Sequence, residues 1–82
     1  MNPHTDRTSQ VQPALGKAIR ELRHKRDETL EVLAGKAGIT PNMLSLIERG
    51  KGNPTWTTVN MVAKALGVSV AELAKAAEKF EK

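Results

Sequence analysis

Residues 29–54 constrain the fold more than any other part of this chain, because their residue types mark the ends of two short helices. Thr29 is suited to cap the first helix, and the apolar residues after it recur at spacings of three and four, the period of a helix with one buried face. Gly38 ends that helix, since glycine enters the left-handed cap conformation at little cost. Thr40 and the proline after it begin a second helix, which we expect over residues 41–49.

The second of these helices has two different sides. At about 100° per residue, one side is apolar and is predicted to be core, whereas the other carries an amide, a hydroxyl and a guanidinium. Such groups contact base edges and phosphates when a helix lies in the major groove of DNA. The pattern therefore predicts a helix-turn-helix. The predicted core side is Met43, Leu44 and Ile47, and the predicted outer side is Asn42, Ser45, Leu46 and Arg49.

An ordered set of short motifs runs through the same region and beyond it. The motifs are Leu33-Ala34, Gly38-Ile39, Leu44-Ser45, Ile47-Glu48-Arg49-Gly50, Asn53-Pro54, Ala63, Ala65-Leu66-Gly67-Val68 and Glu72-Leu73. With the helix before them, they resemble the Cro and lambda-repressor-like family, often called the Xre type, over residues 15–73. The resemblance implies an all-α, compact domain of five helices in which helices two and three form the helix-turn-helix. It also implies a sequence-specific transcriptional regulator, most often a repressor, with no enzymatic activity, cofactor or metal.

The resemblance also implies which residues would contact double-stranded DNA. Hydrogen-bonded base contacts would fall to Asn42, Ser45 and Thr40, whereas Leu46 or Met43 would touch a thymine methyl group. The first helix would lie beside the DNA backbone, and the loop after the second helix of the motif would bind it as well. The expected phosphate contacts are Lys17, Arg20, Arg49, Lys51 and Asn53.

Several of these residues have a structural alternative. The resemblance implies that Glu48 bridges between helices. Arg49 has pairing with an acid such as Glu48 or Glu31 as its alternative to binding phosphate. The loop that contains Lys51 would be an ordinary glycine-rich turn. Trp56, in the first turn of the following helix, is expected to cover the core, with a flat surface near the DNA backbone as the alternative.

The segment before the motif is expected to have two parts. Residues 1–12 are polar and lack apolar periodicity, so they are predicted to form a flexible N-terminal tail. The alternative is an arm that follows a DNA groove, to which only His4 and Arg7 would contribute. A proline then opens the first helix of a DNA-binding domain that we expect over residues 13–74.

The C-terminal helix is predicted from a capping box, a serine at residue 69 followed three residues later by a glutamate. Its apolar seam continues past the point where the family's compact domain often ends, so residues 75–82 are interpreted as an extension of the helix. We expect Leu73, Ala77 and Phe80 to contact a second copy of the chain, giving a homodimer. The alternative is that this helix folds back onto its own core.

Composition favours a small binding module over an enzyme. The 82 residues permit one domain, and the absence of cysteine excludes a disulfide framework or a thiolate metal site. The two histidines, His4 and His24, have no neighbours spaced for a catalytic triad or for metal ligation. Thirteen Lys and Arg against nine Asp and Glu give a net charge of +4, which favours a polyanionic partner.

The sequence also bears on location and on other partners. No apolar run approaches the roughly 20 residues that cross a bilayer, and the N-terminus lacks the apolar core of a signal peptide, so we expect a cytoplasmic protein without membrane contact. The competing function is an antitoxin or a transcription adaptor whose main partner is another protein, because a fold does not determine a function.

Overall fold

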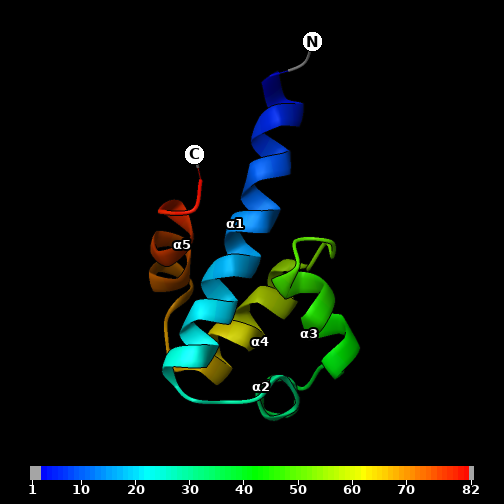
Figure 1. The fold of residues 1–82 in the computed structure, drawn as a ribbon, viewed down its shortest axis with the longest axis vertical. Helices are drawn as coiled ribbons and strands as arrows, with labels where there is room; N and C mark the ends of the chain where they lie inside the picture. Colours follow the sequence, from blue (N-terminus) through cyan, green and yellow to red (C-terminus); the bar gives the residue numbers. More distant parts are fainter. Residues whose placement is uncertain (1–2, 82) are drawn as a thin grey trace.

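Five α-helices joined by short connections make up residues 3–81, which are the residues that this computed structural model describes, and no strand occurs among them (Figure 1). α1 runs through the middle of the molecule, with α5 packed on one side and α3 on the other, and α2 packs against α3 and α4. The predicted all-α class with five helices is confirmed. The helices are α1 (Pro3–Lys25), α2 (Leu30–Ala37), α3 (Pro41–Glu48), α4 (Trp56–Leu66) and α5 (Val70–Glu78).

The helix ends form where their capping residues predict them. Each of the last four helices begins with a hydroxyl oxygen that accepts a hydrogen bond from the backbone amide three residues further on, at 3.0 to 3.1 Å. Glu72 completes the capping box, because its carboxylate accepts the backbone amide of Ser69 at 2.8 Å. This contact lowers the pKa of the Glu72 carboxyl, since it stabilises the charged form. The capping residues are Thr29, Thr40, Thr55 and Ser69.

The first helix begins earlier than the sequence predicts. α1 starts at Pro3, so the predicted start at residue 13 is wrong, and the helix includes residues 3–12, which were expected to form a flexible tail. A proline inside a helix removes one backbone hydrogen bond without removing the others, and a polar segment needs no buried face to form helical hydrogen bonds. The side chains of His4 and Arg7, the alternative DNA-binding arm, lie outside the described part of the structure.

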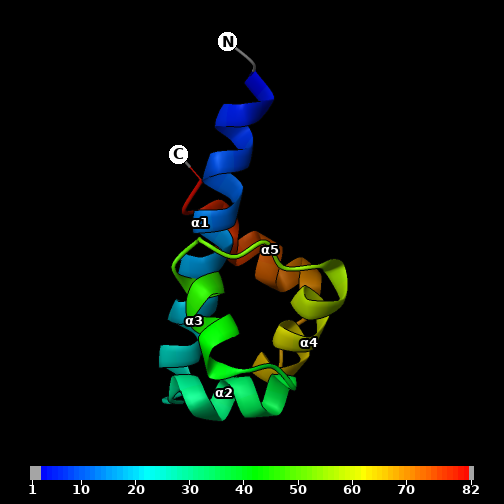
Figure 2. The same ribbon diagram turned by 90° about the vertical axis from the view of Figure 1, so that its right-hand side faces the viewer.

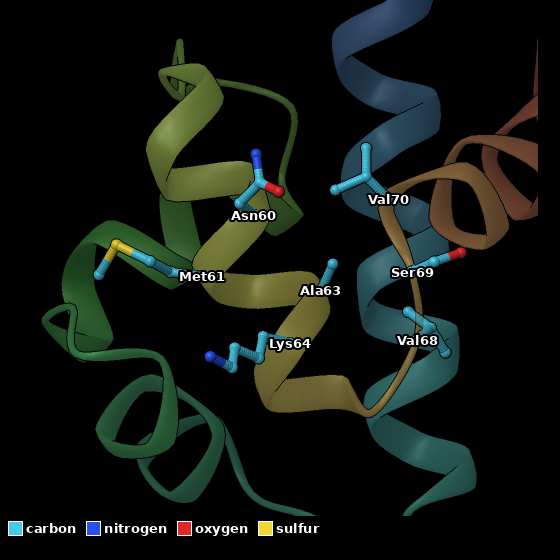
Figure 3. Close-up of a pocket in the computed structure, with 7 residues that line it drawn as sticks. All are labelled: Asn60, Met61, Ala63, Lys64, Val68, Ser69 and Val70. Atoms are coloured by element: carbon cyan, nitrogen blue, oxygen red, sulfur yellow. The ribbon is translucent and has the colours of Figure 1, made fainter.

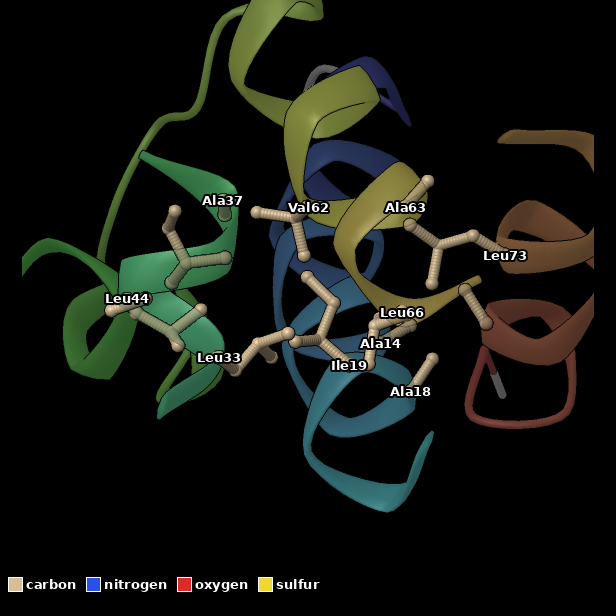
Figure 4. Close-up of a cluster of buried hydrophobic side chains, with 13 residues drawn as sticks. Ala14, Ala18, Ile19, Leu33, Ala37, Leu44, Val62, Ala63, Leu66 and Leu73 are labelled. Atoms are coloured by element: carbon tan, nitrogen blue, oxygen red, sulfur yellow. The ribbon is translucent and has the colours of Figure 1, made fainter. Parts of the chain in front are cut away.

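One apolar core fills the space between the helices (Figure 4). Ile19 of α1 lies near its middle, between Leu33 of α2 and Leu66 of α4. This core fixes the position of α3 because α3 also contributes to it. The largest fully buried side chains are Ile19, Leu33, Leu44, Val62, Leu66 and Leu73.

The C-terminal helix packs on its own chain. Leu73 is 0% exposed and Ala77 is 6% exposed, because both belong to the core, and Phe80 is half-buried against that core. The prediction that these residues form a dimer contact is therefore wrong for Leu73 and Ala77, which a second copy cannot reach. α5 also ends at Glu78, so the expected helical extension over residues 75–82 stops short. The physical reason is that α1 offers α5 a surface lined with buried alanines, which allows close packing.

Candidate nucleic-acid interface

The turn between α2 and α3 has the geometry of a helix-turn-helix. Gly38 adopts a left-handed conformation with φ 76°, which reverses the chain direction after α2. The Ile39 amide then donates to the Ala34 carbonyl at 3.0 Å and closes the turn. Because the cap residue Thr40 follows directly, α3 begins one residue after this turn.

The buried side of α3 differs from the predicted one at two positions. Leu44 and Ile47 are buried as expected, but Met43 is 45% exposed, so its assignment to the core is wrong. The third buried position belongs instead to Glu48, a charged residue. Helical periodicity assigns apolar residues to the core and does not foresee that an ion pair allows a charged residue to be buried beside them.

Glu48 is buried because Arg23 of α1 neutralises it. The Arg23 guanidinium donates to both carboxylate oxygens of Glu48, through Nε at 2.7 Å and Nη2 at 2.9 Å, and the two side chains are only 11% and 6% exposed. This hydrogen-bonded pair raises the pKa of Arg23 above its ordinary value. Nη1 of the same group donates to the Glu28 carbonyl at 3.0 Å. A single guanidinium therefore joins α1, the connection to α2, and α3, and the bridging role implied for Glu48 is confirmed.

The outer side of α3 carries the expected base-contacting residues. Asn42 and Met43 are exposed, and Ser45 and Leu46 are partly exposed. The Thr40 side chain is exposed too, but its hydroxyl oxygen accepts the Met43 amide at 3.1 Å, so it serves first as the helix cap. Four of these side chains belong to α3 and the fifth to its N-cap, so all five can enter the major groove of DNA together.

The loop after α3 adds positive charge beside this surface. Arg49 and Lys51 are exposed, and Arg49 forms none of the ion pairs found among residues 13–81, so its alternative pairing with Glu48 or Glu31 does not occur. The loop folds back on α3, with the Lys51 amide donating to the Leu46 carbonyl at 2.9 Å.

A cleft of about 270 Å³ lies between α3, this loop and the start of α4. Figure 2 shows α3 and the loop that runs from its end to α4 on the same side of the molecule. The expected phosphate-contacting residue Asn53 lines the cleft together with two of the expected base-contacting residues. The lining residues are Met43, Leu46, Ile47, Gly52, Asn53, Pro54, Thr55 and Thr58.

Two of the expected phosphate contacts lie away from α3 and from the loop that follows it. Lys17 and Arg20 are exposed on α1 and line a separate hollow beside Phe80, between α1 and the end of α5. α5 and α3 lie on different sides of α1 (Figure 1). The expected DNA-contacting residues between 40 and 53 therefore lie on α3, its cap and the loop after it, whereas those of α1 lie on another surface.

Two surface features were not expected from the sequence. Trp56 is 70% exposed, so the expectation that it covers the core is wrong. The second feature is a shallow hollow along α4 and the connection to α5, where half-buried apolar side chains surround Ala63 (Figure 3). Its lining residues are Asn60, Met61, Ala63, Lys64, Val68, Ser69 and Val70.

Features of a metal site or of a membrane-spanning helix do not occur in the described part of the chain. Among the side chains of residues 13–81, no group of three His, Cys, Asp or Glu could hold a metal ion. In that same span no helix combines the length and the apolar character that crossing a membrane requires.

The architecture and the outer side of α3 define a helix-turn-helix protein. The family model described as a helix-turn-helix domain matches residues 14–76. The chain is 39% identical over 59 residues to an uncharacterized HTH-type transcriptional regulator, y4dJ, of Sinorhizobium fredii, a match that covers 72% of this chain and 77% of the relative. The chain belongs to the helix-turn-helix family, in agreement with its resemblance to Xre-type regulators.

Two further relatives extend this comparison. The chain is 37% identical over 59 residues to the immunity repressor protein of Bacillus phage phi105, but the match covers 72% of this chain and only 41% of that repressor. Among solved structures, the clp gene regulator ClgR from C. glutamicum is similar with a TM-score of 0.85 and 33% identity, over 88% of this chain and 92% of that chain. The shared part is therefore the helical domain itself.

Proposed function

We propose that this protein is a sequence-specific regulator of transcription that binds double-stranded DNA and acts as a repressor. The observation that carries this proposal is the juxtaposition of the polar outer side of α3 with the exposed cations Arg49 and Lys51. A helix of this kind enters the major groove, and cations beside it neutralise phosphates and release counterions. Bound near a promoter, the domain would exclude polymerase.

Base contacts and phosphate contacts are assigned to different residues. Asn42 is the strongest candidate for base recognition, since a carboxamide pairs bidentately with adenine and discriminates by about 1–3 kcal/mol. Ser45 and Thr40 offer hydroxyls, and Leu46 and Met43 offer apolar contact to a thymine methyl group. Arg49, Lys51 and Asn53 are proposed for the phosphates, with Lys17 and Arg20 as more distant contributors.

This division of roles predicts two different mutant phenotypes. Asn42→Ala should relax base preference more than it weakens overall affinity, because it removes a base contact. Lys51→Ala should weaken binding to every sequence and lower the slope of log K against log salt by about 0.9, because it removes one phosphate contact. Titrations of labelled duplexes at several salt concentrations measure both effects. Lys75→Ala, which removes an exposed cation from α5, is the matched control and should leave the slope unchanged. Identical behaviour of the first two variants would refute the division.

Selection of bound duplexes from a random pool at near-physiological salt tests the proposed function directly. We expect enrichment of two inverted half-sites about one helical turn apart. If only salt-sensitive binding without any sequence preference survives, the proposal fails. The function of an antitoxin or a transcription adaptor, with a protein as main partner, would then take its place.

We also propose that the protein acts as a homodimer, through the hollow along α4 rather than through the residues first expected. Leu73 and Ala77 are buried within one chain, whereas Met61, Val68 and Val70 present partly exposed apolar surface around the hollow (Figure 3). Pairing two copies across this surface would bury those side chains and present two α3 helices to a palindromic site.

A charged substitution in the hollow tests this arrangement. Val70→Arg should shift the protein from dimer to monomer in sedimentation equilibrium, because it places a charge in the proposed apolar contact. Val32→Arg is the matched control, since Val32 is an exposed valine on α2 outside the hollow. Helical content measured by circular dichroism should stay the same in both variants. A dimer that persists in Val70→Arg would place the contact elsewhere.

A further inference from the structure

Trp56 is an exposed aromatic residue. It belongs neither to the core nor to the contacts proposed for α3. It is 70% exposed, compared with 46% for Val32 and 45% for Met43, the other large exposed apolar residues among residues 13–81. An indole ring left in water combines a large apolar surface with one hydrogen-bond donor, and such rings are typical of binding surfaces. Trp56 is therefore available for contact with a binding partner.

Trp56 lies at the end of α4 that the loop from α3 reaches (Figure 2). It is the first residue of α4, and Cα–Cβ bonds in a helix tilt toward the N-terminus, so its ring projects past the beginning of α4. That end of α4 is where the loop from α3 arrives (Figure 2). Its near neighbours Thr55 and Thr58 line the cleft that also contains Leu46. Trp56 thus follows directly in the chain on Thr55, which lines the cleft beside the surface proposed to contact DNA.

The electrostatic surroundings of Trp56 favour an anionic occupant. The first turn of α4 contains no acidic residue, so no negative side chain offsets the partial positive charge at this helix end, where Thr55 caps one amide. The exposed cations Arg49 and Lys51 lie in the loop that leads to it. An acidic polymer with apolar segments fits this combination, and the DNA backbone has both phosphates and deoxyribose rings.

We propose that Trp56 packs against the sugar-phosphate backbone of bound DNA, beside the groove that α3 enters. The ring covers a deoxyribose, and its Nε1–H donates to a phosphate oxygen. This inference rests on the proposed function and adds an uncharged contact to it. Since the contact involves no cation, it contributes affinity without releasing a counterion.

The single tryptophan provides a direct measurement of this contact. Acrylamide should quench the tryptophan fluorescence less efficiently, and the emission maximum should shift, as a duplex selected for binding is added to the protein. A mobility-shift titration of the same samples establishes independently whether the duplex is bound. If the duplex is bound and acrylamide quenching is unchanged, the Trp56 contact is refuted while DNA binding stands. If no duplex binds, both the proposed function and this inference fail.

Substitution of Trp56 gives a second, independent test. Trp56→Ala should lower affinity for all bound sequences by about tenfold, while the salt slope stays equal to that of the wild type. Trp56→Phe should recover part of the loss, since the ring remains and only the donor is removed. Lys51→Ala is the contrasting variant, because it changes the slope. An unchanged affinity in Trp56→Ala, with the same unfolding temperature as the wild type, would overturn the proposal.

Discussion

Arg23→Ala should lower the free energy of unfolding by about 3–5 kcal/mol, the cost of leaving one partner of a buried ion pair without the other. The Glu48 carboxylate is 6% exposed and receives two hydrogen bonds from Arg23, at 2.7 and 2.9 Å. Removing the guanidinium also leaves the Glu28 carbonyl without its donor at 3.0 Å. Urea unfolding at neutral pH, followed by circular dichroism, measures the loss.

Two further variants identify the buried charge as the cause. Arg23→Met combined with Glu48→Leu should be far less destabilising than Arg23→Ala alone, because no unpaired charge then remains in the interior. Lys79→Ala breaks the ion pair between Lys79 and Glu21, in which the two side chains are 52% and 34% exposed. It should lower the free energy of unfolding by at most about 1 kcal/mol. If Arg23→Ala costs no more than Lys79→Ala, the pair does not hold α3 against α1.

The same pair should also affect binding. α3 is held in place by the apolar core on its buried side and by the ion pair between its Glu48 and Arg23 of α1. The orientation of the outer residues of α3 therefore depends on this ion pair. The double variant keeps a folded core and removes the directional hydrogen bonds. We expect it to bind its preferred duplex less tightly than the wild type does, as measured in the salt titrations described above.

Helix ends were predictable because they depend on neighbouring residues alone. A hydroxyl that accepts an amide three residues later, as at Thr40, and a glycine with positive φ, as at Gly38, are formed by local chemistry. The helix-turn-helix consists of such local features, so its two helices appear where the sequence predicts them. Its exposed residues Asn42, Ser45 and Leu46 follow from helical periodicity.

Features that depend on distant parts of the chain were not predictable in this way. The apolar seam of α5 has two possible occupants, a second copy or its own α1, and sequence periodicity is the same for both. The structure selects α1, which buries Leu73 and Ala77. Likewise, Glu48 is buried although it is charged, and its burial depends on Arg23, which is 25 residues away in the sequence.

The contact between α1 and α3 at Gly16 leaves no room for a side chain. A Cβ atom at this position would collide with the carbonyl oxygen of Ile47 and would lie 2.6 Å from that of Glu48. Both neighbours are backbone atoms at the end of α3, so they cannot move aside as a flexible side chain would. The two helices therefore approach each other only because residue 16 has no side chain.

Gly16→Ala should consequently lower the free energy of unfolding by about 2–3 kcal/mol, because the strain of overpacking exceeds the intrinsic helical gain of alanine over glycine, about 0.5–1 kcal/mol. Gly35→Ala is the matched control, since Gly35 also lies within a helix but has open space where its Cβ would be. It should stabilise the protein by about 0.5–1 kcal/mol. Opposite signs in urea unfolding would show that packing against α3, and not helix propensity, selects glycine at residue 16. Stabilisation by both substitutions would mean that α1 and α3 do not cross at this contact.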